Sequence, residues 1–157
     1  MPNGNPKWKE KELPKLERFF NRIATVLEEF AQIHNLMIER YYHEGPGWTF
    51  MFQHPKGGSG QIEIERSGQN AILIRCSWYI DDYDNNTRWL KYPPGQKCSL
   101  DHATLKAVLE ESLRQIFSWN KEDLEPLKSK YYAWSKHFSK AEFDEQRSKY
   151  PTPKLDK

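Results

Sequence analysis

Residues 61–81 read QIEIERSGQNAILIRCSWYID, in which two segments of alternating apolar and polar residues flank the polar turn SGQN. Alternation with a period of two is the pattern of a β-strand that buries one face. Ile62 and Ile64 mark the buried face of the first segment. The second segment has one continuous apolar side, formed by Ile72, Ile74, Cys76, Trp78 and Ile80. The stretch therefore predicts an antiparallel hairpin within a sheet.

Three further alternating segments extend this hairpin. Two of them, at 36–43 and 48–53, precede it, and a third, at 87–92, follows it. Short links rich in Gly, Pro, Asn and Asp separate all five segments, which favours a meander of five antiparallel strands. In the second strand Trp48, Phe50 and Phe52 share one side. We expect this side to face the helices.

Helical periodicity replaces the alternation on both sides of the sheet region. Residues 14–34 repeat apolar side chains at intervals of three and four, and a second stripe runs from 105 to 117. Further helices are predicted near 123–137 and 140–149. The order α-β-β-β-β-β-α predicts an α+β fold. In it, a five-stranded antiparallel meander packs one face against two long helices, and one or two C-terminal helices follow.

These elements form a single domain over residues 14–149, with the C-terminal helices within 121–149. A chain of 157 residues is typical of one domain. The first 13 residues are rich in Asn, Gly, Pro and Lys, so we expect a disordered arm there. Residues 150–157 carry prolines and lysines and predict a disordered tail.

The charge balance bears on the expected partners and compartment. Because 24 basic and 22 acidic side chains leave a net charge of +2, nothing favours nucleic acid or an anionic membrane. No stretch approaches the roughly 20 apolar residues of a membrane span, and the opening residues lack the apolar segment of a signal peptide. We expect a cytoplasmic protein whose only cysteines, Cys76 and Cys98, stay unpaired.

Familiar motifs for catalysis and ligand binding are incomplete. Residues 82–86 imitate the first half of a calcium loop, but Thr87 and Pro93 stand where that loop needs glycine and glutamate. The GGSG segment at 57–60 leads into a strand, so it predicts a flexible hairpin loop instead of a phosphate loop. The five histidines lack the spacing of metal ligands. The sequence therefore predicts no metal and no cofactor, and it favours a non-enzymatic protein.

The sheet face turned away from the long helices is the candidate binding surface. Alternation gives it carboxylates, a histidine, an arginine and tyrosines. Such a face is either solvated, with its charges paired across strands, or enclosed, so that burial separates the pKa values of its acids and bases. The residues that we select for binding are Glu39, Tyr41, His43, Arg75 and Tyr79 on this face and Trp134 from the aromatic C-terminal segment.

Two hypotheses about function follow. The first is a small cytosolic, non-enzymatic binding or accessory domain, which holds a partner protein or a second copy of itself through the free sheet face or the C-terminal helices. The alternative is a cone-shaped α+β domain whose sheet encloses a small-ligand pocket, with or without chemistry. The wall of that pocket would be aromatic and consist of Trp48, Phe50, Phe52, Trp78 and Trp89.

Overall fold

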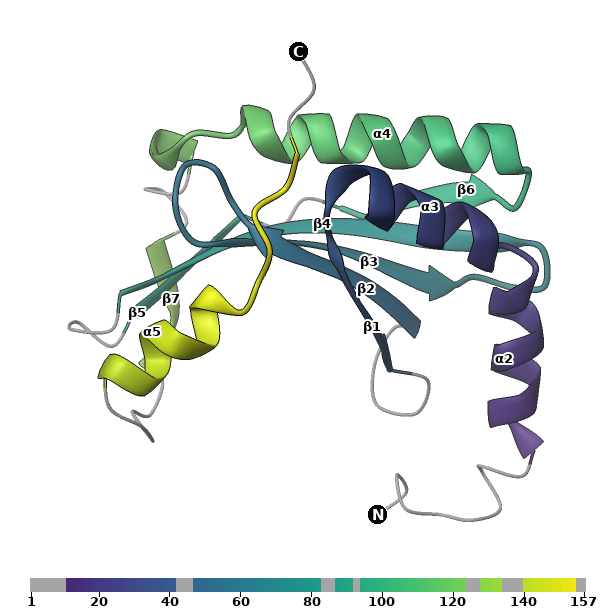
Figure 1. Cartoon of the computed structure of the whole chain (residues 1–157), viewed down its shortest axis with the longest axis horizontal. Coiled ribbons are helices and arrows are strands. Elements are labelled where there is room, and N and C mark those ends of the chain that lie inside the picture. The colour runs from purple at the N-terminus through teal and green to yellow at the C-terminus, as the bar shows by residue number, and fades with distance from the viewer. Residues whose placement is uncertain are drawn as a thin grey trace.

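The computed structural model describes residues 11–41, 47–82, 87–91, 94–123, 128–133 and 140–154. Figure 1 shows a twisted antiparallel sheet with helices along one face, and a shorter helix, α5, on the opposite side near one end. The predicted α+β class is confirmed. The helices are α2 (Leu13–Asn21), α3 (Ala24–His34), α4 (His102–Ser118) and α5 (Lys140–Ser148), with the 3-10 turn η2 at Lys121–Asp123.

The five predicted strands pair in chain order, each antiparallel to the next. They are β1 (Met37–Tyr41), β2 (Gly47–Gln53), β3 (Ser59–Arg66), β4 (Ala71–Asp82) and β5 (Thr87–Lys91). Two strands were not predicted: β6 (Gln96–Ser99) pairs with the first part of β4, and β7 (Lys128–Ala133) pairs with β5. The helix expected at 123–137 is therefore wrong. Tyrosines favour an extended chain, and β7 supplies hydrogen-bond partners to β5.

The register of the sheet aligns apolar residues in rows across three strands. Trp48 lies opposite Ile64, Phe50 opposite Ile62, and Phe52 opposite Gly60. Each aromatic ring of β2 then contacts a ring of a different helix. The ring centroids are 6.3 Å apart for Phe20 of α2 with Trp48, 5.3 Å for Phe30 of α3 with Phe50, and 5.8 Å for Phe52 with Phe117 of α4. The prediction that this side of β2 meets the helices is confirmed.

The single helix expected at 14–34 is two helices with a break at Arg22 and Ile23. Ile23 is fully buried at the break, so the bend keeps the apolar sides of both helices on the sheet. The carbonyl oxygen of Arg22 accepts a hydrogen bond of 2.9 Å from Nε2 of His102, the first residue of α4. A contact from α4 thus satisfies a backbone group at the break.

The loop between β2 and β3, which we expected to be flexible, is bound to the end of α4. Lys56 Nζ donates to the carbonyl oxygen of Trp119 at 3.0 Å and to Oδ1 of Asn120 at 2.8 Å. The indole of Trp78 donates to the carbonyl oxygen of Gly57 at 2.7 Å. Gly58 has φ +76°, and a Cβ there would collide with the Tyr79 carbonyl oxygen. The glycines therefore permit a fixed loop.

Residues 150–154, expected within a disordered tail, form an ordered strap beside β2 and α3. The backbone and side-chain amides of Gln53 donate to the carbonyl oxygens of Pro151 and Tyr150, at 2.9 and 2.8 Å. Lys154 N–H donates to the carbonyl oxygen of His34 at 2.9 Å. These bonds satisfy a carbonyl group at the end of α3 and an amide group at the end of β2. The local sequence of the strap does not predict its order, because the groups that bind it lie far away in the sequence.

Asn35 connects the end of α3 to the strap and provides a test of it. This residue adopts the left-handed conformation, with φ 58° and ψ 56°, and its Nδ2 donates to the carbonyl oxygen of Thr152 at 2.8 Å. Asn35→Gly keeps the backbone conformation but loses the bond, so we expect it to lower the free energy of unfolding by about 1 kcal/mol. Asn35→Ala also loses the bond, and alanine adopts the left-handed conformation less readily than asparagine, so we expect a total loss of about 2 kcal/mol. Urea unfolding measures both, and an unchanged glycine variant would contradict the strap contact.

Candidate functional site

Glu39 and Arg75, two of the six predicted site residues, lie in one row of the sheet face that is turned away from the helices. The register runs from Glu39 through Thr49 and Glu63 to Arg75. Tyr79 lies four residues from Arg75 along β4, about 13 Å away at the rise of a strand, so it is not part of this group. Tyr41 lies opposite Gly47 at the end of β1. His43 and Trp134 lie outside the described residues.

The two carboxylates of this row have no partner among the described residues, whereas a carboxylate of the next row is paired. Arg75 forms an ion pair of 3.0 Å with Glu65 from the next row. Neither Glu39 nor Glu63 makes a hydrogen bond or an ion pair with any part of the chain that the structure describes. Burial raises the pKa of Glu63, and the positive charge of Arg75 opposes that rise without cancelling it. Glu63 is therefore a half-buried carboxyl group without a donor.

Ser77 is the most deeply buried residue of this face. Alternation along β4 places it on the same side as Arg75, but it is 0% exposed, and its Oγ has no hydrogen-bond partner among the described residues. The register places it opposite Gln61 and diagonal to Glu63, where side chains about 7 Å apart can interact. Thr49 is also buried. Of the two alternatives, a solvated face does not describe its centre, where both side chains are buried. We call Glu39, Thr49, Gln61, Glu63, Arg75 and Ser77 the polar sheet face.

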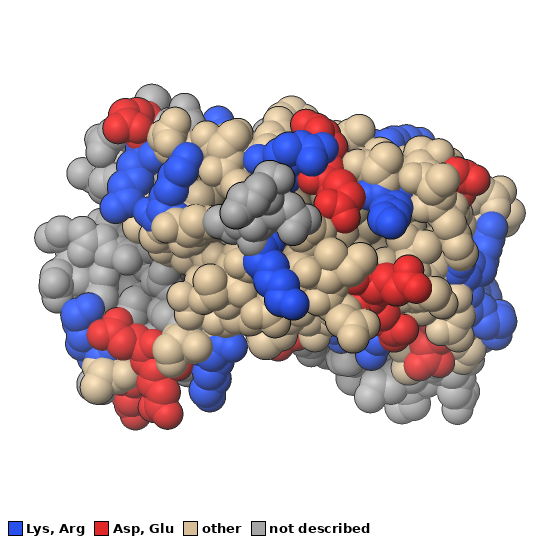
Figure 2. Space-filling view, turned by 45° about the horizontal axis from the view of Figure 1, so that its top comes forward, with Lys and Arg blue, Asp and Glu red and all other residues tan. Residues whose placement is uncertain are grey.

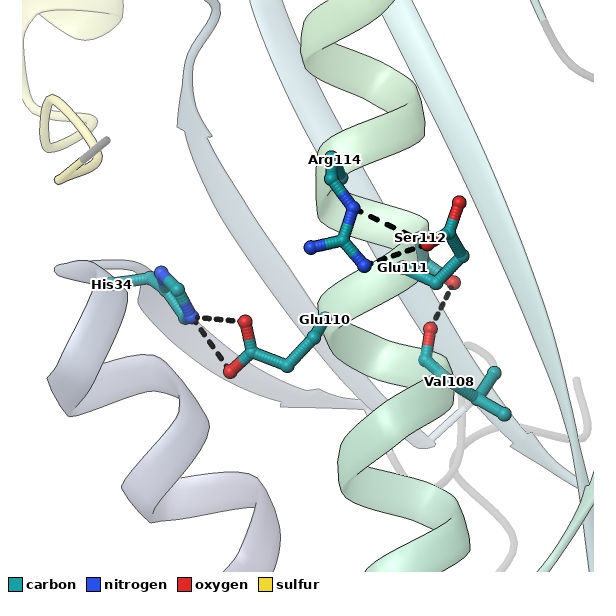
Figure 3. A network of polar contacts seen from close by, with 6 residues as sticks. All are labelled: His34, Val108, Glu110, Glu111, Ser112 and Arg114. Atoms are coloured by element: carbon teal, nitrogen blue, oxygen red, sulfur yellow. Dashed lines mark hydrogen bonds and ion pairs between the residues drawn. The ribbon is translucent and has the colours of Figure 1, made fainter. Parts of the chain in front are cut away.

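A second concave surface lies on the other side of the molecule, between α3 and α4. This α3–α4 cleft has a volume of about 250 Å³. At one end the Nε2 of His34 lies 2.9 Å from both carboxylate oxygens of Glu110, so the imidazole N–H is shared between them (Figure 3). The cleft is lined by Thr25, Val26, Glu29 and Phe30 from α3 and by His102, Ala103, Lys106 and Glu110 from α4.

The surface around the helices has no large region of one charge. Figure 2 shows acidic and basic side chains interspersed over the side that carries the helices, with uncharged surface between them. This arrangement matches the near-neutral net charge. A partner of high charge density such as a nucleic acid binds through a continuous basic area, and the described residues on the face that Figure 2 shows do not form one.

The two thiols are placed for packing. Cys76 and Cys98 are both free and buried. Burial raises the pKa of Cys76 to about 11, although a hydrogen bond with Ser112 opposes the rise. Burial also raises the pKa of Cys98, with a contribution from the charge of Asp101. A nucleophilic cysteine needs the thiolate near neutral pH, so these positions disfavour that role. Among the described residues, no three His, Cys, Asp or Glu side chains converge as metal ligands.

His54 is buried against Trp78, with ring centroids 3.9 Å apart and nearly parallel planes. Its Nε2 donates to the carbonyl oxygen of Ile116 at 2.8 Å, and its Nδ1 accepts the backbone N–H of Lys56 at 3.0 Å. These two bonds define a neutral imidazole. Burial lowers its pKa to about 4; the bond to Ile116 opposes this shift, and the nearby Lys56 charge adds to it.

The low pKa of His54 makes stability depend on pH in a defined window. Between about pH 6.5 and about pH 4 the unfolded chain binds a proton at this residue and the folded chain does not, so stability falls as the pH falls. From pH 7 to about pH 5 the wild type should lose about 2 kcal/mol more than His54→Gln. Urea unfolding at both pH values measures the difference. His102→Gln, at an exposed histidine, should respond like the wild type; equal losses in all three proteins would refute the assignment.

Comparison with known protein families, curated proteins and solved structures finds no match to this chain. None of the helices that the structure describes is both long enough and apolar enough to span a bilayer.

Proposed function

We propose that this protein is a small cytosolic, non-enzymatic binding domain that holds a partner protein on the polar sheet face, through a basic side chain of the partner. The observation that carries this proposal is the half-buried Glu63 carboxyl group, to which no described residue donates a hydrogen bond. A buried polar group without a partner destabilises the fold. A ligand that supplies hydrogen-bond donors removes that cost.

The charge of this surface selects the chemistry of the partner. From β1 to β4 its described side chains include three carboxylates, Glu39, Glu63 and Glu65, and one guanidinium, Arg75. Because Arg75 is already paired with Glu65, the unmatched charge is negative. An arginine of the partner has five N–H donors in a planar arrangement. It can bind the carboxylate of Glu63 or Glu39 with two of these donors at once.

The burial and the internal contacts of the reactive side chains support the non-enzymatic part of the proposal. The two thiols lie in the core with raised pKa values. His54 is fixed by two hydrogen bonds, and His34 is shared between the oxygens of Glu110. A general acid or base must be able to reach a substrate. These groups are instead used for contacts within the protein.

Replacing Glu63 tests whether its burial opposes folding. The raised pKa means that the folded state holds a proton that the unfolded state loses as the pH rises above about 4.5, so this residue lowers stability at higher pH. Glu63→Gln should therefore be more stable than the wild type at pH 7, by about 1 kcal/mol, and the gain should shrink at pH 4.5. Urea unfolding provides the values, with Glu17→Gln, at an exposed site of α2, as the control. A loss of stability in Glu63→Gln at pH 7 would contradict this account.

The partner itself can be captured at the polar sheet face in cells that naturally make the protein. A photoreactive phenylalanine at Gln61 should crosslink one protein through a segment that contains an arginine or lysine. The same group at Ile33, on exposed α3, is the control position. The crosslink should disappear in Glu39→Gln/Glu63→Gln and persist in Glu17→Gln. Equal crosslinking from both positions, or no response to the carboxylate changes, would reject the proposal; a second copy of the chain as the product would identify self-association.

A further inference from the structure

We infer that the α3–α4 cleft binds a small zwitterion, a molecule whose ammonium and carboxylate groups are joined by an apolar chain. This site lies on the helix side of the sheet and is independent of the partner proposed for the polar sheet face. Dipeptides and ω-amino acids share this chemistry. The inference depends on the length of the cleft, its floor and the signs of its unpaired charges.

The two helices form a cleft of fixed length. They run side by side in the same direction (Figure 1). Polar contacts join the helix layer at both ends of the cleft: Glu110 binds His34, and His102 binds the carbonyl oxygen of Arg22. From His102 to Glu110 the helix rises about 12 Å. These contacts close the ends, so the ligand lies along the helices between them.

The floor of the cleft is apolar. Val26 and Phe30 are buried below it, and Ala103 contributes a methyl group from the α4 wall. Thr25 and Ala103 are small, which leaves space between the helices at this level. A chain of methylene groups or a short peptide can lie on this floor and remove apolar surface from water.

The walls carry opposite charges that do not satisfy each other. Glu29 projects from α3 and Lys106 from α4, and both line the cleft. Neither makes an ion pair or a hydrogen bond within the part of the chain that the structure describes. Glu110 adds negative charge at the His34 end of the cleft. An ammonium group can therefore pair with Glu29, with the Glu110 charge adding to the attraction, and a carboxylate can pair with Lys106.

The size and the charges of the cleft favour this class of ligand. A volume of about 250 Å³ is below the usual range for drug-sized molecules, which favours a small ligand over a nucleotide or a large cofactor. A simple cation would leave Lys106 without a partner, and a simple anion would approach Glu29 and Glu110 unfavourably. Only a molecule with both charges satisfies both walls.

The test is a titration of the full chain, observed in two-dimensional amide NMR spectra. The probes are ε-aminocaproate and the dipeptide Ala-Leu, which represent the two sources of this chemistry; hexanoate and hexylamine are the singly charged analogues. We expect at least one zwitterion to bind with a dissociation constant on the order of 1 mM, with shifts confined to the residues that line the cleft. The singly charged analogues should bind at least about tenfold more weakly. Which zwitterion binds more tightly identifies the source.

Matched variants locate the binding. Glu29→Gln and Lys106→Met should each weaken binding about tenfold, whereas Glu17→Gln and Lys97→Met, at exposed sites outside the cleft, should not change it. Ala103→Trp fills the cleft from an exposed helix position and should abolish binding while the spectrum stays dispersed. The inference is overturned if neither zwitterion shifts the cleft residues, if hexanoate or hexylamine binds as tightly, or if Ala103→Trp still binds.

Discussion

The three aromatic side chains of β2 determine where the helices lie on the sheet. Successive residues on one face of a strand are about 7 Å apart, and each of Trp48, Phe50 and Phe52 contacts a ring from a different helix. Such rings bury large areas and pack in preferred orientations. A change in the register of β2 would separate all three pairs at once, so the sheet and the helix layer depend on each other.

This arrangement also explains why a cleft forms between α3 and α4. Phe30 and Phe117 hold the two helices on neighbouring rings of β2, and polar contacts fix the ends of the cleft. Between those ends the facing side chains include the small Thr25 and Ala103. Helices held apart by their contacts to a sheet cannot close over small residues without breaking those contacts. The middle of the cleft therefore stays open and keeps its charges unpaired.

Local patterns in the sequence identified the parts of the fold that depend on them. The five strands of the meander and the side of β2 that meets the helices follow from alternation, because a period of two fixes which side chains share a face. Two features did not follow from local patterns. The break at Ile23 depends on how the helices pack on the twisted sheet, and the strand β7 depends on the edge of β5 with which it pairs. The burial of Ser77 did not follow from alternation either, because a period of two determines which side chains share a face but not how far that face is exposed. Of the predicted binding residues, Glu39 and Arg75 share a row, but the Glu63 next to Arg75 was not selected.

The two candidate surfaces lie on opposite sides of one packed layer. The fully buried Phe50, Ile62 and Ile74 of the central strands separate the polar sheet face from the helices. Close-packed cores change between discrete arrangements and do not deform continuously. A ligand in the α3–α4 cleft would have to move these side chains to affect the opposite face. Because the charged groups of the cleft, Glu29 and Lys106, are exposed above the core, we expect the two surfaces to act independently.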